Sequence, residues 1–159
     1  MELGKTLRVS TRKAWRDWLE KHHAKEKEIW LVFYNKASGK PRIPYNDAVE
    51  EALCFGWIDS TVKKVEKDWF AQRFSPRKPG SQWSEMNKER VRRLSREGKM
   101  TPAGLAAAGV LKAFVIPPDI LKRLRADKKV WRNFQQFPDA YKRIRVGWID
   151  SVRKRPEEF

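Results

Sequence analysis

The chain has one cysteine and two histidines among its 159 residues, and it has no long apolar run. A lone Cys54 cannot form an internal disulfide, so we expect a protein of the reducing cytoplasm. His22 and His23 are adjacent and, with one cysteine, do not make a set of metal ligands, so we expect no metal and no cofactor. No stretch approaches the roughly 18 apolar residues of a membrane span, and residues 1–15 are too polar for a secretory signal.

Positive charge is the strongest feature of the composition. The chain has 36 Lys and Arg against 20 Asp and Glu, which gives a formal net charge of +16. Such a field attracts an anionic small molecule, nucleic acid, anionic lipid or an acidic protein. The same charge can also act only to keep the protein soluble, and the composition does not decide between these interpretations.

The first half of the chain alternates between helical and strand patterns. Apolar spacing predicts helices over about 11–24 and 45–55. The unbroken apolar run 29–34 predicts a buried strand, and 57–65 with 69–74 predicts a hairpin. This pattern is typical of an α+β fold with a small sheet of about three strands packed with helices.

The second half is predicted to be helical. Helices are expected over about 85–97 and from Thr101-Pro102 onward, where Thr caps the helix and Pro takes its first position. The Pro-Pro pair within 116–119 is the best candidate for a boundary. We therefore predict an α+β domain over 1–115 and a C-terminal helical subdomain over 116–159, docked on the first because it is too short to fold well alone.

One pentapeptide occurs twice in the chain. Gly-Trp-Ile-Asp-Ser at 56–60 returns at 147–151. The first copy is expected where a helix gives way to a strand and the second inside a helix, which argues against an internal duplication. Five tryptophans are expected in the core because they lie on apolar stripes, namely Trp15, Trp18, Trp30, Trp131 and Trp148.

A candidate site for anions joins the first pentapeptide to the loop before the helix at 85–97. If the hairpin forms, Asp59 can approach Gln72 and Arg73, and a proline-stiffened loop then leads to a helix start with exposed N–H groups. Aromatic rings between the basic residues could stack on a base or sugar. The predicted binding residues are Trp57, Asp59, Ser60, Arg73, Arg77, Lys78, Ser81, Trp83, Ser84 and Asn87. The alternative is that Arg77 pairs with Asp59 only to hold the loop and that the serines are helix caps.

Three other reactive side chains have simpler interpretations. Cys54 is expected at the C-terminus of a helix, where the partial negative charge raises the pKa of a thiol, so a buried structural cysteine is favoured over a nucleophile. Glu50 and Glu51 could act as acid or base, but neighbouring helix positions diverge, and we expect both on a solvated face.

Several motifs together resemble a known family. The motifs at 50–60, 74–79 and 98–104, together with the C-terminal block 117–149, resemble the YdeI/OmpD-associated family, whose members are also called bacteriocin-protection proteins. The resemblance covers almost the whole chain. It implies a small bacterial protein that protects against bacteriocins or envelope stress, with no settled enzymatic activity. We do not expect direct association with a porin, because residues 1–15 carry no secretory signal.

Two classes of function therefore remain open. The favoured one is a non-enzymatic module that binds an anionic small molecule or nucleic acid at the basic loop. The alternative is a small enzyme that uses Asp59 with Arg73 and Arg77 on a phosphorylated or carboxylated substrate. The sequence does not indicate the oligomeric state.

Overall fold

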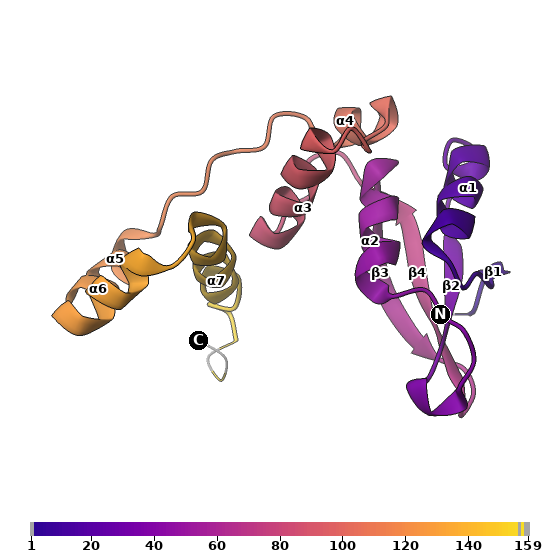
Figure 1. The fold of residues 1–159 in the computed structure, drawn as a ribbon, viewed down its shortest axis with the longest axis horizontal. Helices are drawn as coiled ribbons and strands as arrows, with labels where there is room; N and C mark the ends of the chain where they lie inside the picture. The colour runs from indigo at the N-terminus through magenta and orange to yellow at the C-terminus, as the bar shows by residue number, and fades with distance from the viewer. Residues whose placement is uncertain (1, 156, 158–159) are drawn as a thin grey trace. The chain divides into compact units, whose positions relative to one another are not determined.

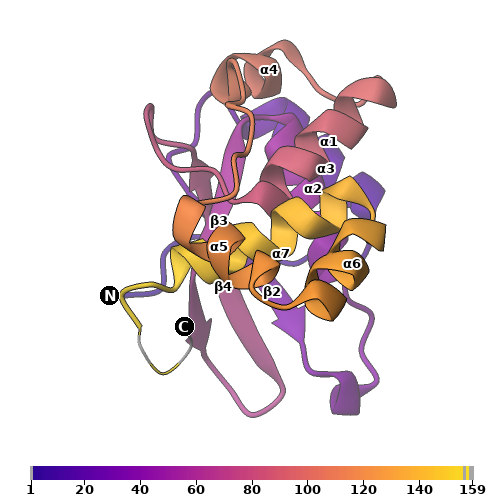
Figure 2. The same cartoon turned by 90° about the vertical axis from the view of Figure 1, so that its left-hand side faces the viewer.

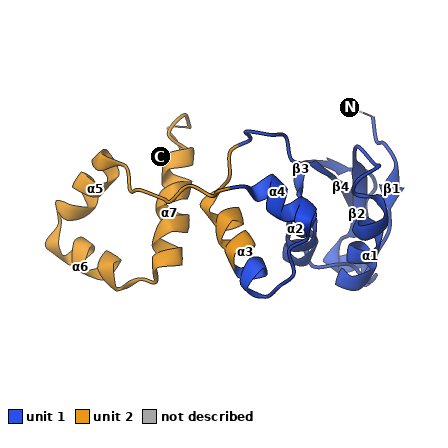
Figure 3. Ribbon diagram, turned by 90° about the horizontal axis from the view of Figure 1, so that it is seen from above, with its two compact units in different colours: residues 1–81, 93–109 blue, residues 82–92, 110–159 orange. Residues whose placement is uncertain are grey.

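A computed structural model describes residues 2–155 and 157 of the chain (Figures 1 and 2). The chain divides into two compact units (Figure 3). Unit 1 comprises Met1–Ser81 with Arg93–Gly109, and unit 2 comprises Gln82–Arg92 with Val110–Phe159. The division passes through helix α3 (Glu85–Arg96). The boundary expected at 116–119 stays a prediction, and residues 156, 158 and 159 of the predicted subdomain lie outside the described residues.

Unit 1 is built on a four-stranded mixed sheet with the order β1-β2-β4-β3 (Figure 1). Its strands are β1 (Thr6–Leu7), β2 (Ile29–Tyr34), β3 (Trp57–Lys64) and β4 (Trp69–Pro76). β1 runs parallel to β2, and β4 is antiparallel to both β2 and β3. The α+β prediction is confirmed, with one strand more than expected because two residues of β1 leave no readable alternation.

Helices α1 (Arg12–His22) and α2 (Tyr45–Cys54) contact each other beside the sheet (Figure 1). Thr11 caps α1 by accepting a hydrogen bond from the Ala14 N–H at 3.1 Å. The rings of Trp15 in α1 and Phe74 in β4 pack edge to face with centroids 5.4 Å apart. Because side chains alternate along a strand, this pair marks the face of β4 that meets the helices.

The opposite face of the sheet has its own apolar cluster, formed by Trp30, Val32, Trp69 and Ala71. A 3₁₀ turn, η1 (Lys36–Ser38), follows β2, and helix α4 (Pro102–Ala108) completes unit 1. Thr101 caps α4 and Pro102 opens it, as predicted. Thr101 Oγ1 also donates to the carbonyl of Cys54 at 2.6 Å, which ties α4 to the end of α2.

Unit 2 is helical, which confirms the expected C-terminal helical unit. Besides the first part of α3, it contains the helices α5 (Pro118–Arg125), α6 (Lys128–Gln136) and α7 (Asp139–Ser151), which are labelled in Figure 2. Arg143 in α7 donates to Glu89 in α3 at 3.0 Å. Two bonds of 2.7 and 2.9 Å from Arg153 to Asp119 connect the end of α7 to the start of α5.

None of the helices in the described part of the chain combines the length and the apolar character that a bilayer crossing needs.

Candidate functional site

The first pentapeptide copy lies at the junction of α2 and β3 and belongs to the core of unit 1. Gly56 has a φ of 75°, the left-handed region that favours glycine. Trp57 is only 1% exposed, and its indole N–H donates to the carbonyl of His23 at 3.2 Å. Trp57 was predicted as a residue that could stack on a ligand, but its ring is packed inside the protein.

Asp59 is held by two neutral donors. Its Oδ2 accepts from the Tyr45 hydroxyl and from the Gln72 amide, each at 2.7 Å. The approach of Gln72 to Asp59 is therefore confirmed. Asp59 faces Phe74 across the hairpin, so Arg73 points to the other side of the sheet. The expected approach of Arg73 to Asp59 is wrong for this reason.

Arg73 has a carboxylate partner of its own. Its Nε donates to Glu28 at 2.6 Å, and Ser60 Oγ accepts from its Nη1 at 3.5 Å. Glu28 was not among the predicted site residues. Its sequence position before a buried strand gave no indication that it would neutralise Arg73.

The basic loop follows β4. The backbone N–H of Arg77 donates to the Gly56 carbonyl at 2.9 Å. Burial lowers the pKa of the Arg77 guanidinium from its ordinary value, and the charge of Asp59 opposes that shift. Lys78 and Ser81 are exposed, and the Ser81 N–H donates to the Lys78 carbonyl at 3.1 Å. These contacts are those of a folded turn next to the first pentapeptide.

The remaining predicted residues belong to unit 2. Ser84 accepts from the Asn87 N–H at 3.2 Å, so its hydroxyl caps α3. The Asn87 side chain accepts from Arg90 at 2.8 Å. Trp83 is partly buried and lines a cavity. The predicted set is thus divided, with Trp83, Ser84 and Asn87 in unit 2 and the other seven residues in unit 1.

The cavity lies wholly within unit 2 and has a volume of about 960 Å³. Its walls come from the stretches 82–88, 113–115 and 144–154. Trp83, Phe114 and Trp148 supply aromatic surface. Ser84, which caps α3, also lines the cavity. The second pentapeptide therefore contributes to this cavity through Gly147, Trp148, Asp150 and Ser151. Trp148 is 51% exposed, so its assignment to the core is wrong.

Positive charge exceeds negative charge among the lining residues. Lys88 pairs with Glu85 at 2.5 Å, and Arg153 pairs with Asp150 at 2.5 Å. Arg145 lies over the ring of Tyr141, with 5.1 Å from its guanidinium carbon to the ring centroid. Among the described residues, Arg145 and Lys154 have no carboxylate within ion-pair distance. Both cations are exposed, and their charge would favour a negatively charged group in the cavity.

Gly147 allows a close approach between α7 and α3. A Cβ built on Gly147 would lie 2.7 Å from Glu85 Cγ and 3.3 Å from Glu85 Cβ. The glycine thus leaves room for the buried Glu85 side chain against α7. Sequence reasoning missed Glu85, Arg145 and Lys154, and the repeated pentapeptide was the signal that could have directed attention to this region.

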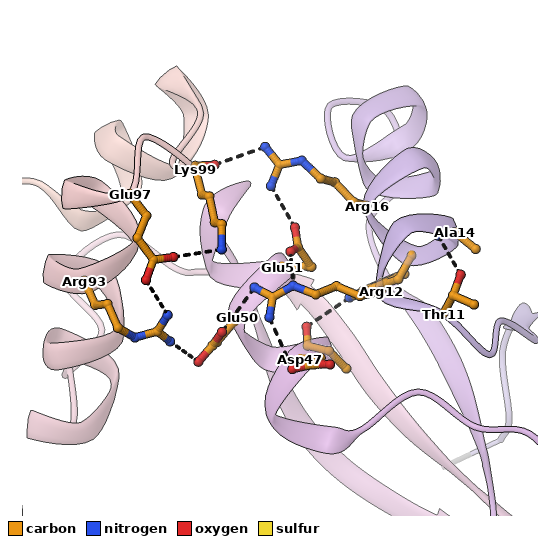
Figure 4. Close-up of polar contacts among 12 residues, drawn as sticks. Thr11, Arg12, Ala14, Arg16, Asp47, Glu50, Glu51, Arg93, Glu97 and Lys99 are labelled. Atoms are coloured by element: carbon orange, nitrogen blue, oxygen red, sulfur yellow. Dashed lines mark hydrogen bonds and ion pairs between the residues drawn. The ribbon is translucent and has the colours of Figure 1, made fainter.

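A dense group of charges in unit 1 has a structural role (Figure 4). Glu51 is 3% exposed, and its two oxygens accept from Arg12 at 2.5 Å and from Arg16 at 2.7 Å. Arg93 joins Glu50 to Glu97. The expectation of a solvated face for Glu50 and Glu51 is wrong, because arginines of α1 and the end of α3 cover them. Positive and negative groups balance here, which leaves little attraction for an external ion.

Cys54 is fully buried, as predicted. Burial, assisted by the charge of Glu51, raises the pKa of its thiol to about 11. A thiol with this pKa is almost entirely protonated at neutral pH and is a poor nucleophile. Within residues 2–155 and 157, no group of three or more His, Cys, Asp or Glu side chains could hold a metal ion.

Two family models match different parts of the chain. One, described as a domain of unknown function (DUF8412), matches residues 7–107, and OmdA, described as "Bacteriocin-protection, YdeI or OmpD-Associated", matches residues 113–159. The match to the second is narrower than the resemblance, which extended over the motifs at 50–104. No curated protein and no solved structure matches the chain. The cavity draws its walls from both matched segments. Because the first model spans more than half of the 159 residues, the chain belongs to the DUF8412 family, with a C-terminal segment similar to OmdA.

Proposed function

We propose that this protein is a non-enzymatic binding module of the bacteriocin-protection type, which captures an anionic ligand in the cavity of unit 2. The observation that supports this function is a cavity of about 960 Å³ with aromatic walls and two cations that lack a carboxylate partner among the described residues. Small-molecule sites have volumes of roughly 300–1,000 Å³ and combine apolar walls with a few polar groups.

The aromatic and the basic side chains of the cavity suit different parts of such a ligand. Trp148 offers an exposed indole face on which a planar ring can stack, a contact worth roughly 1–3 kcal/mol for a nucleic-acid base. Arg145 and Lys154 can then receive a phosphate, sulfonate or carboxylate. The net charge of +16 accelerates the encounter with anions in a salt-dependent way. The ligand is therefore a planar anion.

Binding is favoured over catalysis because the candidate catalytic side chains are already engaged in contacts within unit 1 or are buried. Asp59 accepts hydrogen bonds from Tyr45 and Gln72, and Arg73 is paired with Glu28. The buried Cys54 thiol has its pKa raised to about 11. These contacts stabilise the fold of unit 1 and give the enzyme hypothesis no support.

The segment similar to OmdA overlaps the lining of this cavity, which supports a link between protection and the cavity. The OmdA segment, residues 113–159, supplies most of the cavity wall, including Trp148, Arg145 and Lys154. We infer that protection operates through the ligand bound there, which makes ligand binding the property to measure first.

The test compares two dyes that share an aromatic skeleton. Anilinonaphthalene sulfonate is anionic, whereas N-phenylnaphthylamine lacks the sulfonate, and both fluoresce more strongly in apolar sites. The variant Arg145→Ala/Lys154→Ala should weaken binding of the sulfonate about tenfold and leave the neutral dye nearly unchanged, since about 1.4 kcal/mol of charge interaction is lost.

The matched control is Lys64→Ala/Lys67→Ala, which removes the same charge from exposed positions of unit 1. If both double variants lose sulfonate affinity equally, binding follows net charge alone and the proposed site is wrong. A short single-stranded oligonucleotide added as competitor distinguishes the candidate ligands. Displacement of the sulfonate by micromolar oligonucleotide identifies nucleic acid, and no displacement identifies a small anion.

A further inference from the structure

Helices α5 and α6 of unit 2 carry positive charge that no carboxylate neutralises (Figure 3). Within the described part of the chain, these cations of the two helices are exposed and have no carboxylate within ion-pair distance: Lys122, Arg123, Lys128, Lys129 and Arg132. The basic residues of α1 differ, since Arg12, Lys13 and Arg16 each pair with a carboxylate. The cations of α5 and α6 are therefore available to an external anion.

The carboxylates of the same region are engaged elsewhere. Asp119 and Asp150 both pair with Arg153, and Asp139 pairs with a lysine of its own helix. Asp127 caps α6 by accepting from two backbone N–H groups at 2.8 and 3.0 Å. Helix α6 itself contains no Asp or Glu. A surface that only has to stay soluble usually mixes both signs of charge, so a helix with cations alone favours an anionic partner.

Helix α6 separates its polar and apolar side chains onto two faces. Its polar face consists of exposed residues at the spacing i, i+3, i+4 and i+7, namely Lys129, Arg132, Asn133 and Gln136. On the other side, Trp131 and Phe134 are partly buried and stack with ring centroids 5.9 Å apart. The guanidinium carbon of Arg125 lies 5.0 Å from the Trp131 ring centroid. The outward face thus offers cations and amides, whereas a helix that lies on a lipid surface buries an apolar face in it.

We propose that α6 binds duplex DNA, with its polar face in the major groove. That groove is about 12 Å wide and admits an α-helix, whose diameter with side chains is about 10–12 Å. Arg132 suits the edge of a guanine, and Asn133 and Gln136 suit the edge of an adenine. Lys128 and Lys129, at the start of the helix, neutralise phosphates beside the groove.

This surface is separate from the cavity of the proposed function. The cavity is lined by the stretches 82–88, 113–115 and 144–154, and within the described residues its lining takes nothing from α5 or α6. Duplex binding therefore adds a second activity to unit 2. The dye-binding test of the cavity succeeds or fails independently of it.

The first experiment measures the phosphate contacts through their salt dependence. The probe is a fluorescent DNA duplex of about 20 base pairs, titrated by anisotropy at salt concentrations between about 50 and 200 mM. Each phosphate contact contributes about −0.9 to the slope of log affinity against log salt, so Lys128→Ala/Lys129→Ala should make the slope less steep by about 2. The variant should also bind about tenfold more weakly at the same salt concentration.

The matched control is Lys64→Ala/Lys67→Ala, which removes the same charge from exposed positions of unit 1. It should keep the wild-type slope. If both double variants lose slope and affinity equally, binding follows net charge and the inference is overturned. Absence of duplex binding by the wild-type protein overturns it as well.

A second experiment tests whether α6 contacts bases. The wild-type protein selects duplexes from a random pool, and the enriched duplex is compared with a scrambled one. The wild type should prefer the enriched duplex at least about tenfold, and Asn133→Ala/Gln136→Ala should bring this ratio close to one without changing the salt slope, because no charge is removed. If no sequence is enriched, or if the variant keeps the preference, α6 does not lie in the major groove and the inference is overturned.

Two other anionic surfaces serve as alternative outcomes. The major groove of duplex RNA is too deep and narrow for side chains to read, so an RNA duplex of the enriched sequence should bind at least about tenfold more weakly than the DNA. Equal affinity for both duplexes overturns the inference. Binding to phosphatidylserine vesicles that depends on Lys128 and Lys129, without binding to DNA, identifies a lipid surface as the partner and also overturns it.

Discussion

The two copies of Gly-Trp-Ile-Asp-Ser have the same sequence and different surroundings. In unit 1, the copy turns from α2 into β3, and its tryptophan is 1% exposed. In unit 2, the copy lies at the end of α7, and its tryptophan is 51% exposed at the edge of a cavity. Five identical residues thus serve a core in one place and a candidate binding site in the other.

The aspartates and glycines of the two copies differ in the same way. Asp59 accepts from two neutral side chains, whereas Asp150 pairs with Arg153. Gly56 needs its positive φ, whereas Gly147 is an ordinary helical residue that makes room for Glu85. The backbone conformation and the neighbours contributed by distant segments therefore decide what the pentapeptide does.

The tryptophans should give the largest contrast. Trp57→Ala should destabilise the protein by about 3–5 kcal/mol, because truncation of a buried aromatic residue leaves a cavity. Trp148→Ala should cost about 1 kcal/mol or less, because half of the side chain is already in water. Urea unfolding measures both. Equal losses of unfolding free energy would show that the two copies do not differ as described.

The glycines should give the next largest contrast. A Cβ at Gly56 would lie 2.8 Å from Ala107 Cβ and 3.0 Å from the Ala103 carbonyl oxygen, in a left-handed conformation. Gly56→Ala should therefore cost about 2–4 kcal/mol, from conformational strain and overpacking together.

Gly147→Ala should cost less, about 1–2 kcal/mol, because the new methyl group must displace the buried Glu85 side chain while alanine favours the helix. Thermal melting measures the stability of both glycine variants. If Gly147→Ala unfolds as readily as Gly56→Ala, the two glycines do not differ in the way described.

The pH dependence of unit 2 should show a smaller effect. Two hydrogen bonds from Arg153 lower the pKa of Asp119 from its ordinary value near 3.8 to about 2. Since the folded-state pKa is the lower one, the stabilisation is present above about pH 4 and is lost as the pH falls toward 2. Carboxyl-carbon NMR should give a midpoint near 2 for Asp119, and Arg153→Gln should return it toward 3.8. An unchanged midpoint in that variant would rule out this pair as the cause.

Cys54 should give the smallest response and reports on unit 1 alone. Its thiol is buried with a raised pKa, so a disulfide reagent at pH 7.5 should modify it only after unfolding. Trp57→Ala should accelerate the reaction, and Trp148→Ala should leave its rate within about twofold of the wild type, since destabilisation raises the population of open forms. Rapid modification of the native protein would contradict the burial of Cys54.

Local patterns predicted the elements of this fold well. The apolar run 29–34 and the hairpin signals around Glu66 specified β2, β3 and β4, and caps such as Thr101 marked helix starts. The predictions that were wrong concerned features that depend on contacts between distant parts of the sequence. β1 has two residues and exists only through its pairing with β2, and Glu51 is buried only because Arg12 and Arg16 approach from α1.

The candidate site was harder to predict than the fold. Trp83 and Ser84 were identified from the helix start, and both line the cavity. The other walls come from residues 113–115 and 144–154, and no local pattern joins these segments to α3. Trp148 follows an apolar helical stripe, a pattern that indicates burial against a neighbour but equally suits a ring that lines a cavity.

The most direct measurement follows the indole N–H signals of the eight tryptophans by NMR during a titration with aminonaphthalene sulfonate, with assignments from single Trp→Phe variants. We predict that the signals of Trp83 and Trp148 shift, while that of Trp57, which donates to His23, stays in place. Shifts at Trp57 with none at Trp148 would contradict the account, because the anion would then bind beside the first pentapeptide.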